Sequence, residues 1–341
     1  MSDATASPSA PFQSGPDEPT PSERTPSKRR SPGGRGFRPW PPTGEQVRIS
    51  HRDSEAVTVA VAAGLRTCTL NGHSVVDGFA EGERPSGGRG QTLVPWPNRI
   101  DGGRYRFDGV DQQLPLTEPA RGNASHGLAR WVEWHVAERT DDLVTWEYVI
   151  PPQPGWPTSL LVHVNYAIGP HGLTVSTTAH NVGSAACPYG TGAHPYLTVG
   201  TPTVDTAVVR LPAGRSFQTD DRGIPTGSSA VDGSPYDLRT PQQLGDRVLD
   251  TAYADLDRDD DGRWRLRVAA PGDDSAVELW ADEAYRYAQL FTGDGLPGDE
   301  RRRGLAVEPM TCPANAFVTG EGVIRLGPGA SHTARWGISR S

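Results

Sequence analysis

Two residues with side chains suited to proton transfer each stand directly before a proline in this sequence. His194 lies in Gly192-Ala-His-Pro-Tyr-Leu197, and Glu308 lies in Ala306-Val-Glu-Pro-Met310. Proline fixes its own φ and pushes the preceding residue into extended backbone, so both side chains stand on stiff chain. A histidine and a carboxylate that face each other across a cleft can act as acid and base. Taken singly, each also fits a structural role, as a core histidine or as a strand-end glutamate that points to water.

Two further stretches rich in Gly and Pro present polar side chains, as binding loops often do. In Pro95-Trp-Pro-Asn-Arg99, two prolines bracket a tryptophan and hold Asn98 and Arg99 directly after them. Arginine offers a planar fork of donors that suits hydroxyl, carboxylate or phosphate oxygens. In Asn123-Ala-Ser-His-Gly127, His126 precedes a glycine. An ordinary loop with a surface arginine, and a structural histidine, are the alternatives for these two stretches.

The segments that must position these side chains have the pattern of short antiparallel strands. From residue 46 onward, alternating or β-branched runs recur between Gly, Pro, Asn and Asp. Such runs, with almost no helical periodicity, predict an all-β fold, a sandwich or barrel, formed by one large domain over 46–341. One short helix at 240–246 is the most that we expect. The expected strands cover residues 56–62, 143–150, 160–168, 173–180, 207–211, 263–269, 276–280, 288–292 and 332–338.

The N-terminal stretch, residues 1–45, has a different composition from the rest of the chain. It contains ten prolines and seven serines and almost no large apolar side chains. Such a stretch cannot bury enough apolar surface to offset the entropy lost on ordering. We therefore expect a disordered tail.

Composition excludes several classes of protein and partner. The net charge of the 341-residue chain is −8, which disfavours nucleic acid as a partner. Cys68, Cys187 and Cys312 form no C-x-x-C pair, so we expect neither disulfides nor a zinc site, and a reducing, cytoplasmic setting. Because the sequence shows no signal peptide and no run near ~18 apolar residues, we expect no membrane span. A monomer is the default expectation.

The motifs, taken together and in order, resemble the aldose 1-epimerase (galactose mutarotase) family. No G-x-S-x-G, Walker or dinucleotide-binding motif competes with them. The resemblance runs from about residue 50 to 338, and its Pro-Trp-Pro-Asn-Arg form is similar to a bacterial branch of the family, which leaves the sugar open. It implies a large antiparallel β-sandwich, the galactose mutarotase-like supersandwich, with an open cleft. The stretches that carry it are Pro95–Arg99, Asn123 to Gly127, Asn181 to Tyr196, and Glu308-Pro-Met-Thr-Cys-Pro-Ala-Asn-Ala-Phe317.

The resemblance also implies an activity, the interconversion of sugar anomers, and roles for individual residues. Glu308 matches the general base that takes the proton of the anomeric hydroxyl, and His194 matches the general acid that protonates the ring oxygen. These roles require a protonated histidine and an ionised glutamate, so we expect surroundings that push their pKa values apart in that sense. No cofactor or metal is implied. The residues expected to hold the sugar are Asn98, Arg99, His126 and Asp250, with Trp280 or Trp96 as a stacking surface.

Two other functions fit the same sequence. A hexose-6-phosphate 1-epimerase would need additional cations for the phosphate, and Arg130 or the run 301–303 could supply them. A carbohydrate-binding protein of the same fold would bind sugar without catalysis. The presence of both His194 and Glu308 favours an enzyme over such a binder.

Overall fold

The computed structural model describes residues 40–273 and 275–341, so most of the expected N-terminal tail lies outside the described residues. Residues 40–45, which we had assigned to the tail, belong to the compact unit Trp40–Ser341. Thr43 is fully buried, and its carbonyl accepts a 3.0 Å hydrogen bond from Val61 N. The domain therefore begins earlier than the composition indicates.

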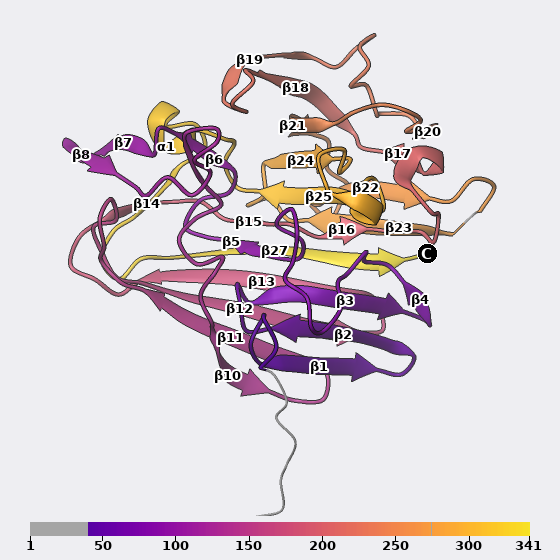
Figure 1. Cartoon of the computed structure of the whole chain (residues 1–341), viewed down its shortest axis with the longest axis horizontal. Helices are drawn as coiled ribbons and strands as arrows, with labels where there is room; N and C mark the ends of the chain where they lie inside the picture. The colour runs from indigo at the N-terminus through magenta and orange to yellow at the C-terminus, as the bar shows by residue number, and fades with distance from the viewer. Residues whose placement is uncertain (1–39, 274) are drawn as a thin grey trace, which may run out of the picture. The chain divides into compact units, whose positions relative to one another are not determined.

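A nine-stranded antiparallel sheet contains the longest strands (Figure 1). Along β12 and β13, buried residues alternate with partly exposed ones, so each strand has one face against the core. This is the pattern that the alternating sequence predicts. In order across the sheet, the strands are β10 (His135–Arg139), β11 (Leu143–Ile150), β12 (Leu160–Gly169), β13 (Gly172–Asn181), β27 (Ser331–Arg340), β23 (Ala276–Ala281), β22 (Trp264–Ala269), β17 (Val208–Arg210) and β20 (Gln242–Gln243).

A second, eight-stranded sheet carries the functional candidates. Its strand β25 (Leu305–Met310) lies in the interior of the sheet, and all six of its residues are buried. A buried polar side chain on this strand must therefore have a functional role or a hydrogen-bond partner that compensates for the cost of its burial. The other strands are β19 (Pro225–Ala230), β18 (Ala213–Thr219), β21 (Asp250–Leu256), β24 (Tyr287–Phe291), β15 (Gly192–Ala193) and β5 (Thr92–Leu93), with β16 (Tyr196–Leu197) also paired to β25.

A four-stranded sheet contacts the nine-stranded sheet at β12. Trp146 Nε1 on β11 donates a 2.9 Å hydrogen bond to Thr58 Oγ1 and so ties the two sheets together. The sheet comprises β1 (Gln46–His51), β2 (Ser54–Val59), β3 (Gly64–Leu70) and β4 (His73–Ser74). The remaining elements are the pairs β6 (Arg99–Asp101) with β9 (Asn123–Ser125), β7 (Arg104–Phe107) with β8 (Val110–Gln113) and β14 (Cys187–Tyr189) with β26 (Ile324–Leu326), the helix α1 (Ala316–Thr319), and 3-10 turns at Val204–Thr206 and Gly298–Glu300.

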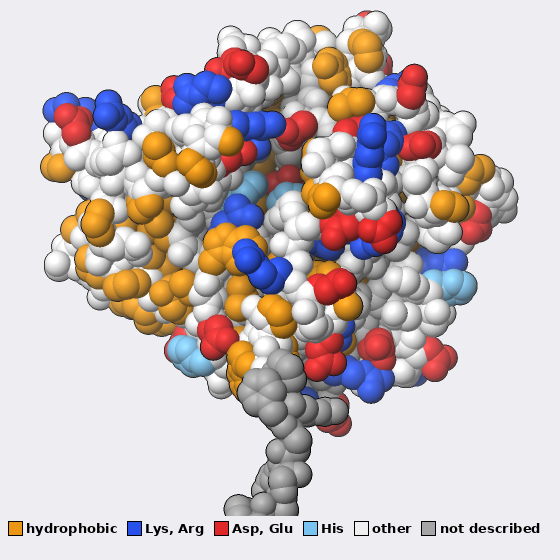
Figure 2. Space-filling model, viewed as in Figure 1, with side chains coloured by type: hydrophobic (Ala, Val, Ile, Leu, Met, Phe, Trp, Pro, Cys, Tyr) orange, Lys and Arg blue, Asp and Glu red, His pale blue; other side chains and the backbone are white. Residues whose placement is uncertain are grey.

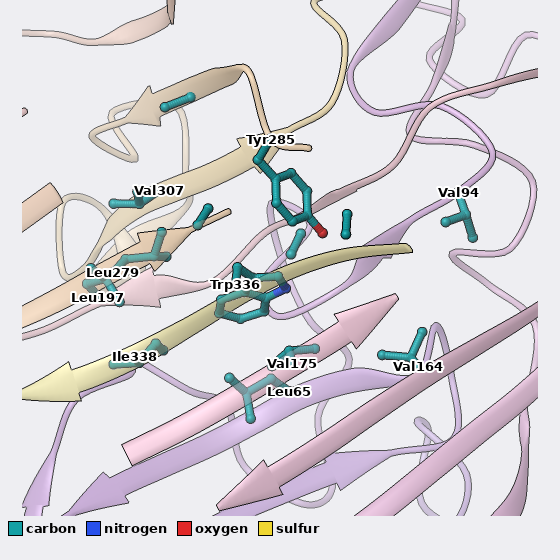
Figure 3. Close-up of a cluster of buried hydrophobic side chains, with 14 of the residues drawn as sticks. Leu65, Val94, Val164, Val175, Leu197, Leu279, Tyr285, Val307, Trp336 and Ile338 are labelled. Carbon is teal, nitrogen blue, oxygen red and sulfur yellow. The ribbon is translucent and has the colours of Figure 1, made fainter. Parts of the chain in front are cut away.

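The core is shared between the two large sheets. Leu279 and Ile338 of the nine-stranded sheet and Val307 of the eight-stranded sheet belong to one buried cluster. Figure 3 shows them together with Trp336 and Tyr285, whose rings fill the space between strands. The fold is thus the all-β antiparallel sandwich that the sequence predicts.

Most of the expected strands exist with nearly the expected bounds, but two expectations fail. The strand expected at 56–62 ends at Val59, because Ala62 and Ala63 adopt positive φ and turn the chain. The helix expected at 240–246 is wrong: residues 242–243 form β20, and Gly245 has a φ of +60°. A helix lies instead at α1. Among the described residues, no helix is long and apolar enough to cross a membrane.

Candidate active site

His194 and Glu308 lie side by side. The short strands β15 and β16, on either side of the His194-Pro195 step, both pair with β25, and Val307 N donates a 3.0 Å hydrogen bond to Pro195 O. This pairing brings His194 Nε2 to 3.2 Å from Glu308 Oε1. The two residues are 4% and 3% exposed, so the contact is sheltered from bulk water.

Burial dominates the electrostatics of this pair. Burial, reinforced by Asp250, raises the pKa of Glu308 well above its ordinary value. Burial and then the nearby charge of Arg130 lower the pKa of His194 to about 3. The uncharged forms of both groups are thus favoured in the unliganded site, because a charge is costly to bury. This order of pKa values is the reverse of the order that we expected from the roles of acid and base.

The pair forms part of the wall of a cavity of about 500 Å³ that opens to the surface. Figure 2 shows a hollow in the face turned to the viewer, with histidine and acidic side chains at its floor. A cavity of this size suits a small-molecule ligand. Of the residues that the sequence analysis expected to act on or hold a sugar, it brings together six: Asn98, Arg99, His126, His194, Asp250 and Glu308.

Arg99 reaches the cavity from the first position of β6, and His126 reaches it from the position directly after β9, the strand that pairs with β6. Asn98 and His126 both have positive φ, of 55° and 60°, which turns their backbones toward each other. His126 N donates to Asn98 O at 2.8 Å, and Asn98 N donates to His126 Nδ1 at 3.2 Å. Because Nδ1 accepts this bond, a neutral His126 carries its proton on Nε2. Burial and then Arg130 lower the pKa of His126 well below its ordinary value, which favours the neutral ring.

Glu118 holds the guanidinium of Arg99 and was missed by the sequence analysis. Arg99 Nε and Nη2 donate to its two carboxylate oxygens at 2.8 and 3.1 Å, the bidentate geometry that fixes an arginine most firmly. Burial alone would raise the pKa of Glu118, but the hydrogen bonds from Arg99 outweigh it and lower the pKa. Glu118 lies in an irregular segment without any motif, so no local signal marked it.

Gln289 links the remaining polar residues of the cavity wall. It lies on β24 directly opposite Glu308, and its Nε2 donates to Asp250 Oδ1 at 2.6 Å. Its Oε1 accepts a weaker bond from Asn98 Nδ2 at 3.4 Å. A single polar residue in the apolar strand Tyr287–Phe291 was a detectable signal. Phe291 of the same strand lines the cavity and is an aromatic face beside the polar groups.

Trp280 is one of the two named tryptophans that the structure places outside the cavity. It lies on β23 of the nine-stranded sheet and does not line the cavity, and the Arg263 guanidinium covers its ring at 3.9 Å. The expectation that Trp280 stacks on a sugar in this site is therefore corrected. Trp96 is also outside the cavity, since it is 2% exposed and packs edge-on against Phe317 in the core.

The arginine run 301–303 does not supply free cations to the cavity. Arg302 pairs with Asp205 and Asp294, and Arg303 pairs with Asp77. Arg130, in contrast, lines the cavity, and its Nε donates a 3.0 Å hydrogen bond to Gln91 Oε1. Within the described ranges, no group of three or more His, Cys, Asp or Glu side chains is arranged to hold a metal ion.

Comparison with known proteins agrees with this fold. The sequence model of the family "Aldose 1-epimerase" matches residues 45–339. The chain belongs to the aldose 1-epimerase family. It is 34% identical over 291 residues to the uncharacterized protein YihR of Escherichia coli, covering 85% of this chain and 91% of that protein. It is 26% identical over 252 residues to human galactose mutarotase, covering 69% and 72%.

Solved structures support the same fold at lower sequence identity. The aldose epimerase homologue from C. elegans superimposes with a TM-score of 0.78 at 19% identity, covering 87% of this chain and 98% of that one. The galactose 1-epimerase from Lactobacillus acidophilus superimposes with a TM-score of 0.71 at 16% identity, covering 87% and 94%. These likenesses concern the fold.

Proposed function

We propose that this chain is an aldose 1-epimerase, an isomerase that interconverts the α and β anomers of a free hexose without a cofactor. The observation that carries the proposal is the buried contact of 3.2 Å between His194 Nε2 and Glu308 Oε1 at a sugar-sized cavity. Family membership supports the same class of reaction. Oε2 of Glu308 is buried and has no hydrogen-bond partner among the described residues, which leaves an acceptor for a sugar hydroxyl.

The reaction needs one base and one acid. Glu308, as the carboxylate, takes the proton from the anomeric hydroxyl, and the carbonyl of the open-chain aldehyde forms at C1. The electron pair of the bond between C1 and the ring oxygen moves to that oxygen, which takes a proton from the protonated His194. Rotation about the C1–C2 bond and the reverse transfers close the ring as the other anomer. Positioned acids and bases each accelerate such transfers by about 10²–10⁴-fold.

The two pKa shifts fit this cycle because the pair carries one proton in both of its forms. The resting form, with a neutral His194 and a protonated Glu308, becomes the reactive form when that proton crosses the 3.2 Å contact. After ring opening, Glu308 holds the proton taken from the sugar and His194 is neutral again. The surroundings that favour uncharged groups therefore favour the state of the pair that accompanies the open-chain aldehyde.

The other cavity residues fit the task of holding a polyol. Arg99 and His126 present N–H donors, and Asp250 presents carboxylate oxygens that accept from sugar hydroxyls. Asn98 contributes an amide, held by Gln289. Phe291 replaces Trp280 as the aromatic face for the apolar side of a pyranose ring.

Polarimetry on a fresh solution of one anomer tests the proposal. The wild-type protein should accelerate the approach of α-D-glucose or α-D-galactose to equilibrium, and Glu308→Gln should remove that acceleration. Glu278→Gln, on β23 and outside the cavity, is the control and should keep the wild-type rate. A wild-type protein that binds sugar but leaves the decay rate unchanged would identify the alternative, a non-catalytic carbohydrate-binding protein.

A hexose-6-phosphate 1-epimerase is the second candidate, and Arg130 is the observation that favours it. Arg130 lines the cavity, and none of the described carboxylates forms an ion pair with its guanidinium, so this cation is available to an anionic substituent. The rate of exchange between anomers, measured by NMR for glucose and for glucose 6-phosphate, distinguishes the two candidate functions. A preference for the phosphate that disappears in Arg130→Gln would establish this second function in place of the first.

A further inference from the structure

The ring of His194 is stacked on the ring of Tyr196. Pro195 keeps the chain extended between them, and residues two apart on an extended chain face the same side. The two rings are nearly parallel, at 8°, with centroids 5.2 Å apart. Tyr196 is fully buried, so it forms a fixed plane behind the histidine.

A buried cation lies against Tyr196. The Arg89 guanidinium carbon is 4.2 Å from the centre of the Tyr196 ring, and the Arg89 side chain is 1% exposed. Asp77 accepts from Arg89 through its carboxylate and, at 3.0 Å, through its backbone oxygen. The same carboxylate also accepts from Arg303 Nε at 2.7 Å. Arg89 is therefore held on the Tyr196 ring by partners that themselves do not touch His194.

The glycine-rich segment around Arg89 contacts the backbone and the ring of His194. Gly90 N donates to His194 O at 2.9 Å, and His194 N donates to Gln91 O at 3.0 Å. A Cβ atom added to Gly88 would lie 2.6 Å from His194 Cδ2, so this glycine lies directly against the imidazole. Tyr196 Oη donates to Gly87 O at 2.9 Å. One short segment, residues 87–91, thus touches both stacked residues.

We propose that residues 87–91 together with Tyr196 form a positioning device for His194, in which Arg89 acts through the Tyr196 ring. The role rests on the proposed function, because a fixed ring matters most if His194 transfers protons to a bound sugar. Arg89 is a positioning residue and not a catalytic one, since Tyr196 separates it from the cavity. A cation on an aromatic face stabilises the stack, and burial strengthens that interaction.

Arg89 also contributes to the electrostatics of His194. Burial and Arg130 are the larger causes that lower the pKa of His194, and Arg89 lowers it further. Removing the Arg89 charge should therefore raise that pKa. The charged and titratable groups that face His194 from the elements around it are Glu308, His126, Arg130, Arg99, Tyr196 and, behind Tyr196, Arg89.

Arg89→Met and Arg303→Met form a matched pair of variants. Each removes one of the two arginines that share Asp77, but only Arg89 lies on the Tyr196 ring. In Arg89→Met, we expect kcat to fall about tenfold with little change in KM, because the proton donor is displaced while sugar contacts remain. In Arg303→Met, kcat should stay near the wild-type value.

The titration of the His194 ring in the unliganded protein, followed by NMR from pH 7 to about 2, is the second readout, because this range includes the wild-type pKa of about 3. We expect an upward shift of the titration in Arg89→Met and none in Arg303→Met. This measurement needs no activity, so it tests the device even if the wild-type protein fails to accelerate anomer exchange. An unshifted titration and unchanged kcat in a folded Arg89→Met, or equal effects in both variants, would overturn the proposal.

If Arg89→Met does not fold, substitutions of Tyr196 test whether its ring positions His194. Tyr196→Phe keeps the stack and loses only the hydrogen bond to Gly87, so it should retain most of the wild-type kcat. Tyr196→Leu removes the aromatic plane, and its kcat should fall about tenfold or more. Equal rates in these two variants would show that the ring does not position His194.

Discussion

His194 Nε2 lies 3.2 Å from Glu308 Oε1, and burial acts on both side chains in the direction that removes their charges. The folded pair therefore binds one proton over a wide pH range. Over the same pH range, these two side chains in the unfolded chain bind between none and two protons. A difference in proton binding between folded and unfolded chains makes stability depend on pH. The two members of the pair contribute to this dependence with opposite sign.

Single substitutions in the pair should give opposite dependences of stability on pH. In Glu308→Gln, the remaining His194 has a folded pKa of about 3 against an ordinary pKa of 6.5, so stability is present above pH 6.5 and falls as the pH drops. In His194→Asn, the remaining Glu308 has a raised pKa, so stability is present below its ordinary pKa of 4.5 and falls as the pH rises. Between pH 7 and 5, the loss in Glu308→Gln should be about 2 kcal/mol.

Urea unfolding of both variants at pH 7 and pH 5 measures this effect. The free energy of unfolding should decrease from pH 7 to 5 in Glu308→Gln and increase in His194→Asn, relative to the wild-type protein. The same direction of change in both variants would contradict the picture of a pair that shares one proton.

Substitution of Gly88 by alanine should remove activity while the fold persists. The added Cβ would lie 2.6 Å from His194 Cδ2, and the φ of +77° adds strain of about 1–2 kcal/mol. The imidazole must then move away from its position beside Glu308. The rate of anomer exchange at saturating sugar, together with circular dichroism, checks this expectation.

Gly102→Ala is the matched control for Gly88→Ala. Gly102 also has a positive φ, of 59°, but its added Cβ would meet no atom within 4 Å. Gly102→Ala should therefore lose about as much stability as Gly88→Ala and keep the wild-type rate of anomer exchange. If both variants lose activity to the same extent, backbone strain and not contact with His194 is the cause.

Replacing Arg99 by lysine should weaken sugar binding more than it slows the reaction. Lysine keeps the charge but cannot make the two parallel hydrogen bonds that Arg99 makes to Glu118. We expect KM to rise about tenfold, corresponding to the loss of a charge-assisted hydrogen bond. Initial rates over a range of sugar concentrations measure it. Arg106→Lys, in an exposed ion pair with Asp111, should leave KM unchanged, and a KM effect of equal size there would exclude the explanation.

The buried tryptophan between the sheets should contribute strongly to stability. Trp336 on β27 is 2% exposed, and Trp336→Ala should cost about 3–5 kcal/mol through lost burial and the cavity left behind. Trp131, which is 47% exposed, is the comparison, and Trp131→Ala should cost much less. Thermal unfolding of the two variants checks the difference. Similar melting temperatures would show that the sheets do not depend on Trp336.

The parts of the fold that the sequence predicted are those with strong local patterns. The alternation in 160–168 and 173–180 reflects strands with one buried face, and the structure has β12 and β13 there. The short strands β15 and β16 carry no such pattern, because two residues are too few for a period. They form because β25 supplies backbone partners, which is information from distant chain.

Residues of the candidate site were predictable from the sequence where a neighbouring proline or glycine distinguishes them. Residues that belong to the site only because the fold brings them close to it were not predictable in this way. His194, Glu308, Asn98, Arg99 and His126 were found through such local marks, and all five line the cavity. Glu118 was missed because its importance comes from its contact with Arg99, whereas Gln289 was overlooked although its polar side chain stands alone in an apolar strand. Trp280 was named by residue type alone, and residue type does not say which face of which sheet a tryptophan occupies.

The cavity is lined by two kinds of backbone. Glu308 and Phe291 stand on the paired strands β25 and β24, whereas Val248, Asp294, Gly295 and Leu296 come from connecting segments. A library of variants confined to Val248, Gly295 and Leu296 would therefore change the lining of the cavity outside the strands and would leave the ion pair of Asp294 with Arg302 intact. Selection from such a library is a direct route to altered sugar preference, because these three residues lie on other pieces of backbone than the pair that we propose transfers protons.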